Sequence, residues 1–156
     1  ILQNIWSNRY GANIGSTYKN VLAIAVGMAV ELGYEINSLS GLITRGLNEM
    51  ITYAKSTKGK VSTLIGLTGV GDLLLTSMSD KSRNRQFGRR FIKEGKKSLD
   101  SKITTEGVSA LKHIYEIGKE KDLHLPIVNG LYSIIFKGAK PENLVNKLIS
   151  STNNFE

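Results

Sequence analysis

The sequence has no cysteine and only two histidines, His113 and His124, among its 156 residues. The lack of cysteine excludes a disulfide framework, a cysteine nucleophile and a zinc site built from thiolates. So few histidines also argue against a histidine-rich metal site. A chain of this length can bury a hydrophobic core without a covalent or metal staple. We therefore expect a single globular domain that holds no metal.

Proline is scarce too: Pro126 and Pro141 are the only ones, and each stands before a run of periodically spaced apolar residues. Proline in such a place is typical of the first turn of a helix. The longest apolar run, residues 21–30, is shorter than the roughly 20 apolar residues that span a membrane. The chain shows no signal peptide and starts with Ile1. We expect a soluble, cytoplasmic protein with no membrane partner.

Acidic residues are outnumbered, because 21 lysines and arginines against 13 aspartates and glutamates give a formal net charge of +8. Basic residues are densest over residues 81–97, called the basic stretch below. This pattern is compatible with a solvated helix face, a site for a small phosphate ligand, or a nucleic-acid surface. Aromatic residues make up only 7% of the chain, whereas proteins that bind single-stranded nucleic acid use aromatic stacking platforms.

Apolar spacing predicts an all-α domain of about seven helices. The first of these is apolar nearly all round, which indicates burial on every side, and Gly33 is a suitable stop. Residues 1–12 are the exception, because weak alternation and a glycine predict a strand followed by a linker. The other segments show helical periodicity. The expected helices cover residues 16–32, 38–54, a segment from 82, 105–120, and segments from 126 and 141.

Lys19 is the first candidate for chemistry, because we expect it in the first turn of the long apolar helix. The helix dipole and partial burial both disfavour a charged amine at that place. Both effects would lower the pKa of Lys19, which suits a general base near neutral pH. The alternative is a lysine that extends to solvent at a frayed helix end.

Polar residues also stand just before the apolar run 73–75 and at the expected start of the helix from residue 82. Asp72 is either an N-cap or a carboxylate that orients a substrate hydroxyl or pairs with a lysine. The Ser82-Arg83-Asn84-Arg85 segment would form an oxyanion or phosphate cradle at the start of a helix, although serine is also a common N-cap. The glycines before Asp72 read Gly-x-x-Gly-x-Gly, which is neither the dinucleotide turn Gly-x-Gly-x-x-Gly nor a P-loop.

These motifs resemble one family, the C-terminal substrate-binding domain of bacterial NAD(P)-dependent glycerol-3-phosphate dehydrogenases. The resemblance covers roughly residues 8–150. It implies a helical domain of the 6-phosphogluconate-dehydrogenase-like type over residues 13–156, with residues 1–12 as the last strand and linker of an absent Rossmann domain. The stretches that carry it are STYKNVLAIAVGMAVELG, LITRGLNEM, GLTGVGDLLLTSMSDKSRNRQFG, TTEGVSAL and LPIVNGLYSIIFKGAKPENLVNKLIS.

The resemblance also implies an activity. The family interconverts sn-glycerol 3-phosphate and dihydroxyacetone phosphate with NAD or NADP and feeds glycerophospholipid synthesis. It suggests a homodimer and no nucleic-acid partner. The chain alone is expected to be inactive, because the dinucleotide-binding turn is missing.

The family's functional residues transfer to matching positions of this sequence. Lys19 would be the catalytic proton acceptor and a substrate contact. A basic helical module for nucleic acid or protein interaction remains the alternative, and such a module would not require Lys19 together with Asp72 and the Ser82-Arg83-Asn84 residues. The resemblance assigns substrate binding also to Asp72, Ser82, Arg83 and Asn84, and cofactor binding to Arg83, Thr104 and Glu106.

Overall fold

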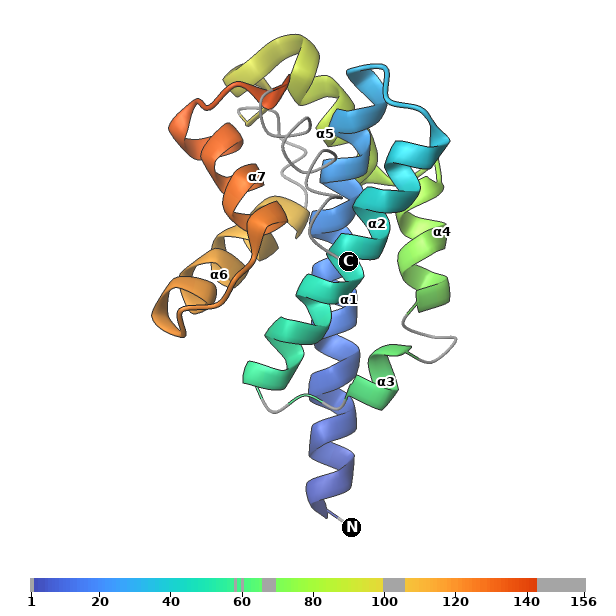
Figure 1. Cartoon of the computed structure of the whole chain (residues 1–156), viewed down its shortest axis with the longest axis vertical. Coiled ribbons are helices and arrows are strands. Elements are labelled where there is room, and N and C mark those ends of the chain that lie inside the picture. The colour runs from blue at the N-terminus through green and yellow to red at the C-terminus, as the bar shows by residue number, and fades with distance from the viewer. Residues whose placement is uncertain (1, 58, 60, 66–69, 100–105, 143–156) are drawn as a thin grey trace, which may run out of the picture.

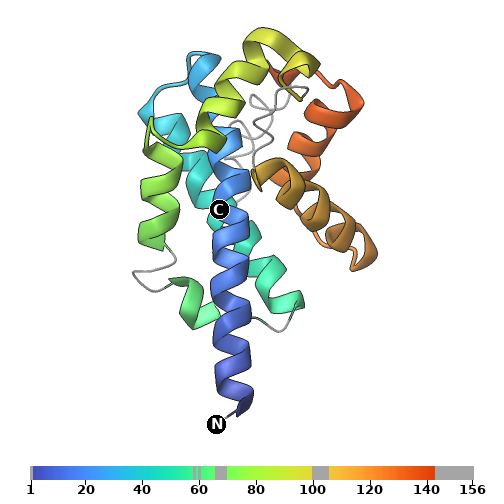
Figure 2. The same cartoon turned by 180° about the vertical axis from the view of Figure 1, so that it is seen from behind.

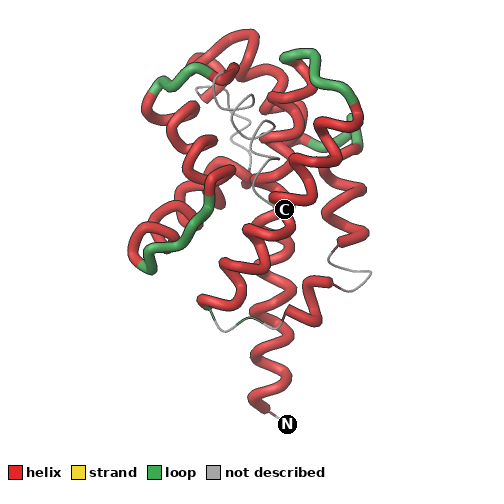
Figure 3. The backbone as a smooth tube through the Cα atoms, in the orientation of Figure 1, coloured by secondary structure: helices red, strands yellow, loops and turns green. Residues whose placement is uncertain are grey.

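The computed structural model describes residues 2–57, 59, 61–65, 70–99 and 106–142. Within these ranges the fold is all-helical, as expected (Figure 3). No helix of the described part is long and apolar enough to cross a membrane. In chain order the elements are α1 (Leu2–Glu31), α2 (Ile36–Ser56), α3 (Val61–Ile65), α4 (Asp72–Met78), α5 (Arg83–Glu94), the 3-10 helix η2 (Gly95–Leu99), α6 (Glu106–Glu120) and α7 (Pro126–Lys137).

Helix α1 is the axis on which the other helices pack. Figures 1 and 2 show it running the length of the molecule, with α4, α5 and α6 arranged around its C-terminal part. Residues 21–29 of α1 are all buried, which confirms the expectation of a helix covered on every side. The helix stops at Gly33, whose φ of +86° lies in the left-handed region that glycine adopts without strain.

The expected strand over residues 1–12 is wrong for residues 2–12, which form the first turns of α1. A lone strand would leave its backbone N–H and C=O groups without a neighbouring strand, whereas a helix pairs them within the segment. The boundaries of α2, α5, α6 and α7 agree with expectation to within a few residues, and Pro126 begins α7. Helices α3 and α4 are not among the expected helices. The helix expected from Pro141 lies largely outside the described residues.

Helices α1 and α5 touch backbone to backbone. A Cβ atom at Gly88 would lie 2.2 Å from the carbonyl oxygen of Ile24, and one at Gly27 would lie 2.1 Å from that of Arg85. Both distances are far shorter than any van der Waals contact, so only glycine fits at these crossing points. The contact therefore fixes where the start of α5 stands beside α1.

A buried carboxylate joins three helices. Glu49 of α2 accepts hydrogen bonds from the main-chain N–H groups of Ile127 at 2.5 Å and Val128 at 3.3 Å, and from the hydroxyl of Tyr18 at 3.3 Å. It thereby caps the start of α7, where the N-cap residue Leu125 offers no side-chain acceptor. Burial raises the pKa of Glu49 to about 7, although its hydrogen-bond donors act in the opposite direction.

We expect Gly88→Ala to lower the free energy of unfolding by about 1–3 kcal/mol or more, because α5 must move away from α1. Gly41→Ala is the matched control, since a Cβ there meets nothing within 4 Å. It should stabilise the protein by about 0.5–1 kcal/mol through helix propensity alone. Urea unfolding measures both, and a Gly88→Ala variant as stable as the parent would contradict the close contact.

Glu49 should also make stability depend on pH. Its pKa in the folded protein lies above the ordinary value of 4.5, so between about pH 4.5 and 7 the folded protein binds more protons than the unfolded chain. This contribution to stability is fully present below about pH 4.5 and is lost as the pH rises through 7, by about 3 kcal/mol.

Glu49→Gln removes the titration, so its unfolding free energy should vary less than that of the parent between pH 5 and pH 8, as measured by urea unfolding at both values. The variant is expected to be less stable overall, because its amide N–H₂ must face the N–H groups of α7. The change of the unfolding free energy with pH, and not its absolute value, therefore tests the assignment. Parallel pH profiles for the two proteins would contradict the assignment.

Candidate active site

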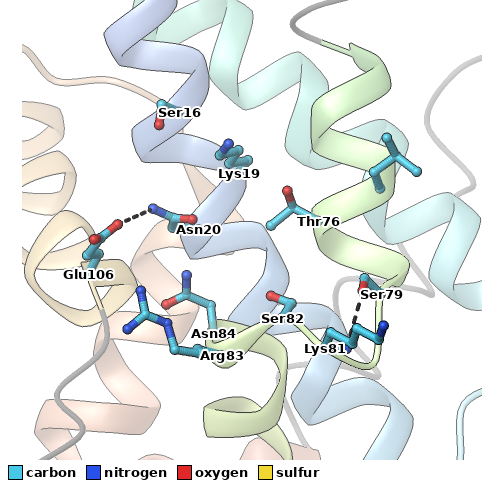
Figure 4. A pocket seen from close by; sticks show the side chains of 11 residues that line it. Ser16, Lys19, Asn20, Thr76, Ser79, Lys81, Ser82, Arg83, Asn84 and Glu106 are labelled. Carbon is cyan, nitrogen blue, oxygen red and sulfur yellow. Dashed lines mark hydrogen bonds between the residues drawn. The ribbon is translucent and has the colours of Figure 1, made fainter.

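An open pocket of about 430 Å³ lies where α1, the α4–α5 connection and the start of α6 meet (Figure 4). Its wall is rich in hydroxyl, amide and cationic groups, with a single carboxylate. Such donors suit a ligand that carries oxyanions and hydroxyls. The residues that line it are Ser16, Lys19, Asn20, Leu75, Thr76, Ser79, Lys81, Ser82, Arg83, Asn84 and Glu106.

Lys19 and Asp72 form an ion pair at the edge of this pocket. The Nζ atom of Lys19 lies 2.5 Å from Oδ2 of Asp72, and the two side chains are 21% and 49% exposed. Asp72 is the first residue of α4, and Gly71, which precedes it, is the N-cap. The carboxylate therefore pairs with the lysine, as one of the sequence interpretations had it, and the N-cap interpretation of Asp72 is wrong.

The predicted place of Lys19 needs a correction. Because α1 begins at Leu2 and not near residue 16, Lys19 lies nearly five turns inside the helix. The helix dipole acts within the first turn only, so the effect of the dipole expected at Lys19 does not apply. The frayed-end alternative fails for the same reason. The side chain is held by Asp72 across the gap between α1 and α4.

The Ser82-Arg83-Asn84 segment opens α5. Ser82 is the N-cap, and its Oγ accepts the main-chain N–H of Arg85 at 3.4 Å. Arg83 follows as the first helical residue and is exposed at the pocket wall. Figure 4 shows its guanidinium on the same side of the pocket as Glu106. The N-cap role of Ser82 is thus confirmed, and it leaves the hydroxyl at the pocket wall.

Asn84 links two elements of the site. Its side chain is buried, and its Oδ1 accepts the main-chain N–H of Gly107 at 3.0 Å. This bond ties the start of α6 to the start of α5. A Cβ at Gly107 would lie 2.5 Å from the same oxygen, so the glycine is needed for the approach. Asn84 therefore builds the pocket wall in addition to lining it.

Glu106, expected at the cofactor, is the first residue of α6 and is exposed at the pocket. Its Oε2 accepts a 3.5 Å hydrogen bond from Nδ2 of Asn20, the neighbour of Lys19 on α1. Thr104, the other residue that the resemblance assigned to the cofactor, lies outside the described residues. The structure thus brings Glu106 to the same pocket as the lysine and Arg83.

Sequence reasoning missed Ser16, Asn20 and Thr76, which all line the pocket. Helical spacing contains the signal that would have found them. Ser16 lies three residues before Lys19, Asn20 lies four residues after Ser16, and Thr76 lies four residues after Asp72. Side chains three or four residues apart share a helix face.

Carboxylates pair with three cations of the basic stretch. Nη2 of Arg85 lies 3.3 Å from Asp80, while Arg89 and Lys93 both pair with Glu31, at 3.0 and 3.1 Å. Hydrogen bonds from Arg89 and Lys93 lower the pKa of Glu31. In the described part of the chain, no group of three acidic or histidine side chains could hold a metal ion. Of the basic stretch, Lys81 and Arg83 line the pocket, whereas Lys96 and Lys97 are exposed outside it.

Comparison with known proteins now identifies the domain. Residues 8–146 match the sequence model of the family described as "NAD-dependent glycerol-3-phosphate dehydrogenase C-terminus". The chain belongs to this family. The glycerol-3-phosphate dehydrogenase [NAD(P)+] of Mycoplasma mobile is 43% identical over 161 residues, covering 97% of this chain and 48% of that protein. The corresponding protein of Ruthia magnifica is 42% identical, covering 90% and 44%.

Solved structures agree with this assignment of the glycerol-3-phosphate dehydrogenase domain. The crystal structure of the Coxiella burnetii glycerol-3-phosphate dehydrogenase is 32% identical and superposes with a TM-score of 0.83 over 90% of this chain and 44% of that one. A Dunaliella salina structure at 23% identity, with a TM-score of 0.74, supports the fold. The chain spans about half the length of the curated relatives it matches. These relatives support the dehydrogenase interpretation and not the nucleic-acid alternative.

We expect Asn84→Ala to lower the free energy of unfolding by about 1–3 kcal/mol, because the buried N–H of Gly107 loses its acceptor. Asn84→Asp keeps an oxygen at that position and should retain most of the stability. Thermal unfolding compares the two variants. An alanine variant as stable as the parent would show that the bond between α5 and α6 contributes nothing.

Proposed function

We propose that this chain is the substrate-binding half of an NAD(P)-dependent glycerol-3-phosphate dehydrogenase. It would act in the interconversion of sn-glycerol 3-phosphate and dihydroxyacetone phosphate by hydride transfer. The observation that carries the proposal is the Lys19–Asp72 pair at 2.5 Å, set beside a pocket that also holds Arg83 and Asn84. The family membership supports the same substrate class.

Lys19 would handle the proton of the reaction. Oxidation of a secondary alcohol requires a base for the hydroxyl proton, and the reverse reaction requires a donor to the carbonyl oxygen. Nζ of Lys19 is at the pocket wall, and Asp72 holds it in place through one of its carboxylate oxygens. Asp72 is half-exposed, so its other oxygen is able to accept a substrate hydroxyl.

The phosphate of the substrate would lie toward the start of α5. Arg83 is exposed there, and a guanidinium binds a phosphate through two parallel hydrogen bonds. The hydroxyl of Ser82 and the amide of Asn84 line the same wall. The N-terminus of α5, a helix of 12 residues, adds its positive dipole end to this wall. These groups bind the anion without taking part in the proton transfer.

The nicotinamide cofactor would supply the hydride acceptor and donor. The described residues contain no strand, and the sequence has no Gly-x-Gly-x-x-Gly turn, so this chain holds only one side of the cofactor site. Arg83 and Glu106 fit that side, because both are exposed at the pocket beyond Lys19 and offer a cation for a phosphate and an acceptor for hydroxyl or amide groups.

The proposal extends to the complete protein. Residues 13–156 would form the substrate domain, and a Rossmann domain would precede it; residues 2–12, being helical, would join the two as an extension of α1. The family resemblance is the support for proposing that the complete protein is a cytoplasmic homodimer that feeds glycerophospholipid synthesis. Sedimentation of the complete protein tests the dimer.

Kinetics of the complete protein test the role of Lys19. Lys19→Ala should lower kcat by about 10²–10⁴-fold and change KM little, because a positioned base acts in the transition state. Arg83→Ala is the contrasting variant, and it should raise KM for dihydroxyacetone phosphate, because the guanidinium holds the phosphate in both ground and transition state. The assay follows NADH oxidation with dihydroxyacetone phosphate. A Lys19→Ala enzyme with normal kcat and raised KM would make Lys19 a binding residue.

A further inference from the structure

Arg85 is a buried cation that the proposed reaction does not use. It lies in the first turn of α5 and is only 8% exposed, directly after Ser82, Arg83 and Asn84. An arginine is almost never buried without partners that offset the loss of water. The partners of Arg85 therefore show what it holds in place.

The guanidinium of Arg85 reaches back over the connection between α4 and α5. Its Nη1 donates to the carbonyl oxygen of Met78, the last residue of α4, and its Nη2 lies 3.3 Å from the carboxylate of Asp80. Nε2 of Gln86, the next residue, donates to the carbonyl oxygen of Asp80 at 2.9 Å. The end of α4 and the turn that follows it are thus attached to α5 by side chains.

The main chain of Arg85 contacts Ser82 and α1, whereas its side chain contacts the end of α4. Its N–H donates to Oγ of Ser82, and its carbonyl oxygen lies against α1, where a Cβ at Gly27 would come within 2.1 Å. Arg85, a residue of the helix that carries Arg83, consequently contacts both α1, which carries Lys19, and α4, which carries Asp72.

We propose that Arg85 is a positioning residue, which holds the turn Ser79–Arg83 at the distance from Lys19 and Asp72 that the phosphate substrate requires. The inference rests on the proposed function and deepens it. Four residues of this turn line the pocket, and two hydrogen bonds onto Ser79 order it: Lys81 N–H to Oγ at 3.2 Å and Ser82 N–H to the carbonyl oxygen at 3.1 Å.

The two-pronged contact requires arginine and not merely a positive charge. The guanidinium spreads its donors over a rigid plane, so Nη1 and Nη2 can serve two acceptors on different residues at once. A lysine in the same place has one nitrogen on a flexible stem, and it can hold either the carbonyl of Met78 or the carboxylate of Asp80 in a fixed geometry. Arg85→Lys should therefore keep the fold and loosen the turn.

The test titrates sn-glycerol 3-phosphate into the ¹⁵N-labelled 156-residue chain and follows the amide signals of the turn. Arg85→Lys and Arg85→Met should weaken binding by about tenfold to a hundredfold, because a displacement of about 1 Å at a site has effects of this size. Asp80→Asn, at an exposed side chain, removes the charge that Nη2 of Arg85 meets without opening a cavity, and it should give a smaller loss. Arg89→Met is the matched control, since Arg89 lies on the same helix as Arg85 and pairs with Glu31 of α1 but does not line the pocket.

Amide hydrogen exchange separates positioning from a general loss of stability. The N–H groups of Lys81 and Ser82 should lose protection in the Arg85 variants, while Val26 and Met28 in the core of α1 keep theirs and Arg89→Met changes neither. Binding by Arg85→Met equal to the parent, or unchanged exchange at Lys81 and Ser82, would overturn the inference. A parent chain that fails to bind glycerol 3-phosphate at millimolar concentration would instead overturn the proposed function, and the inference with it.

Discussion

The backbone contact between α1 and α5 is the constraint on which the rest of the site depends. Two glycines, Gly27 and Gly88, let the helices approach until carbonyl oxygens lie where side chains would stand. At that distance the two backbones are in direct contact, so α5 cannot shift toward α1 by moving a flexible side chain aside. The contact with α1 therefore fixes the position of the residues at the start of α5, and α1 also carries Lys19.

Two carboxylates on either side of α1 are used in opposite ways. Glu49 is buried and accepts only neutral donors, including the hydroxyl of Tyr18, so burial dominates and raises its pKa. Asp72 is half-exposed and meets the ammonium of Lys19, the very next residue along α1. Consecutive residues of one helix thus face the core and the pocket. This division keeps Glu49, which caps α7, apart from Asp72, which pairs with Lys19.

The spacing of apolar residues along the chain predicted most of the helices. The features that it did not predict depend on contacts between segments that are distant in the sequence. The apolar period is a local property, and it located the buried part of α1. Residues 2–12 were mistaken for a strand, because alternation says nothing about whether a partner strand exists. The pairing of Lys19 with Asp72 was one of two open interpretations, and 53 residues separate the two along the chain. The structural role of Asn84 depends on the tertiary approach of Gly107, for which no local signal exists.

The charge of the pocket follows from where the helices begin. Asp72, Arg83 and Glu106 are the first residues of α4, α5 and α6, and all three starts meet the interior of α1. A helix start carries partial positive charge, which favours an anion and also stabilises a carboxylate side chain placed there. The arrangement therefore lets two acidic residues remain beside a site for an oxyanion. Lys19, in the middle of α1, has no such dipole, so Asp72 is the group that fixes its amine.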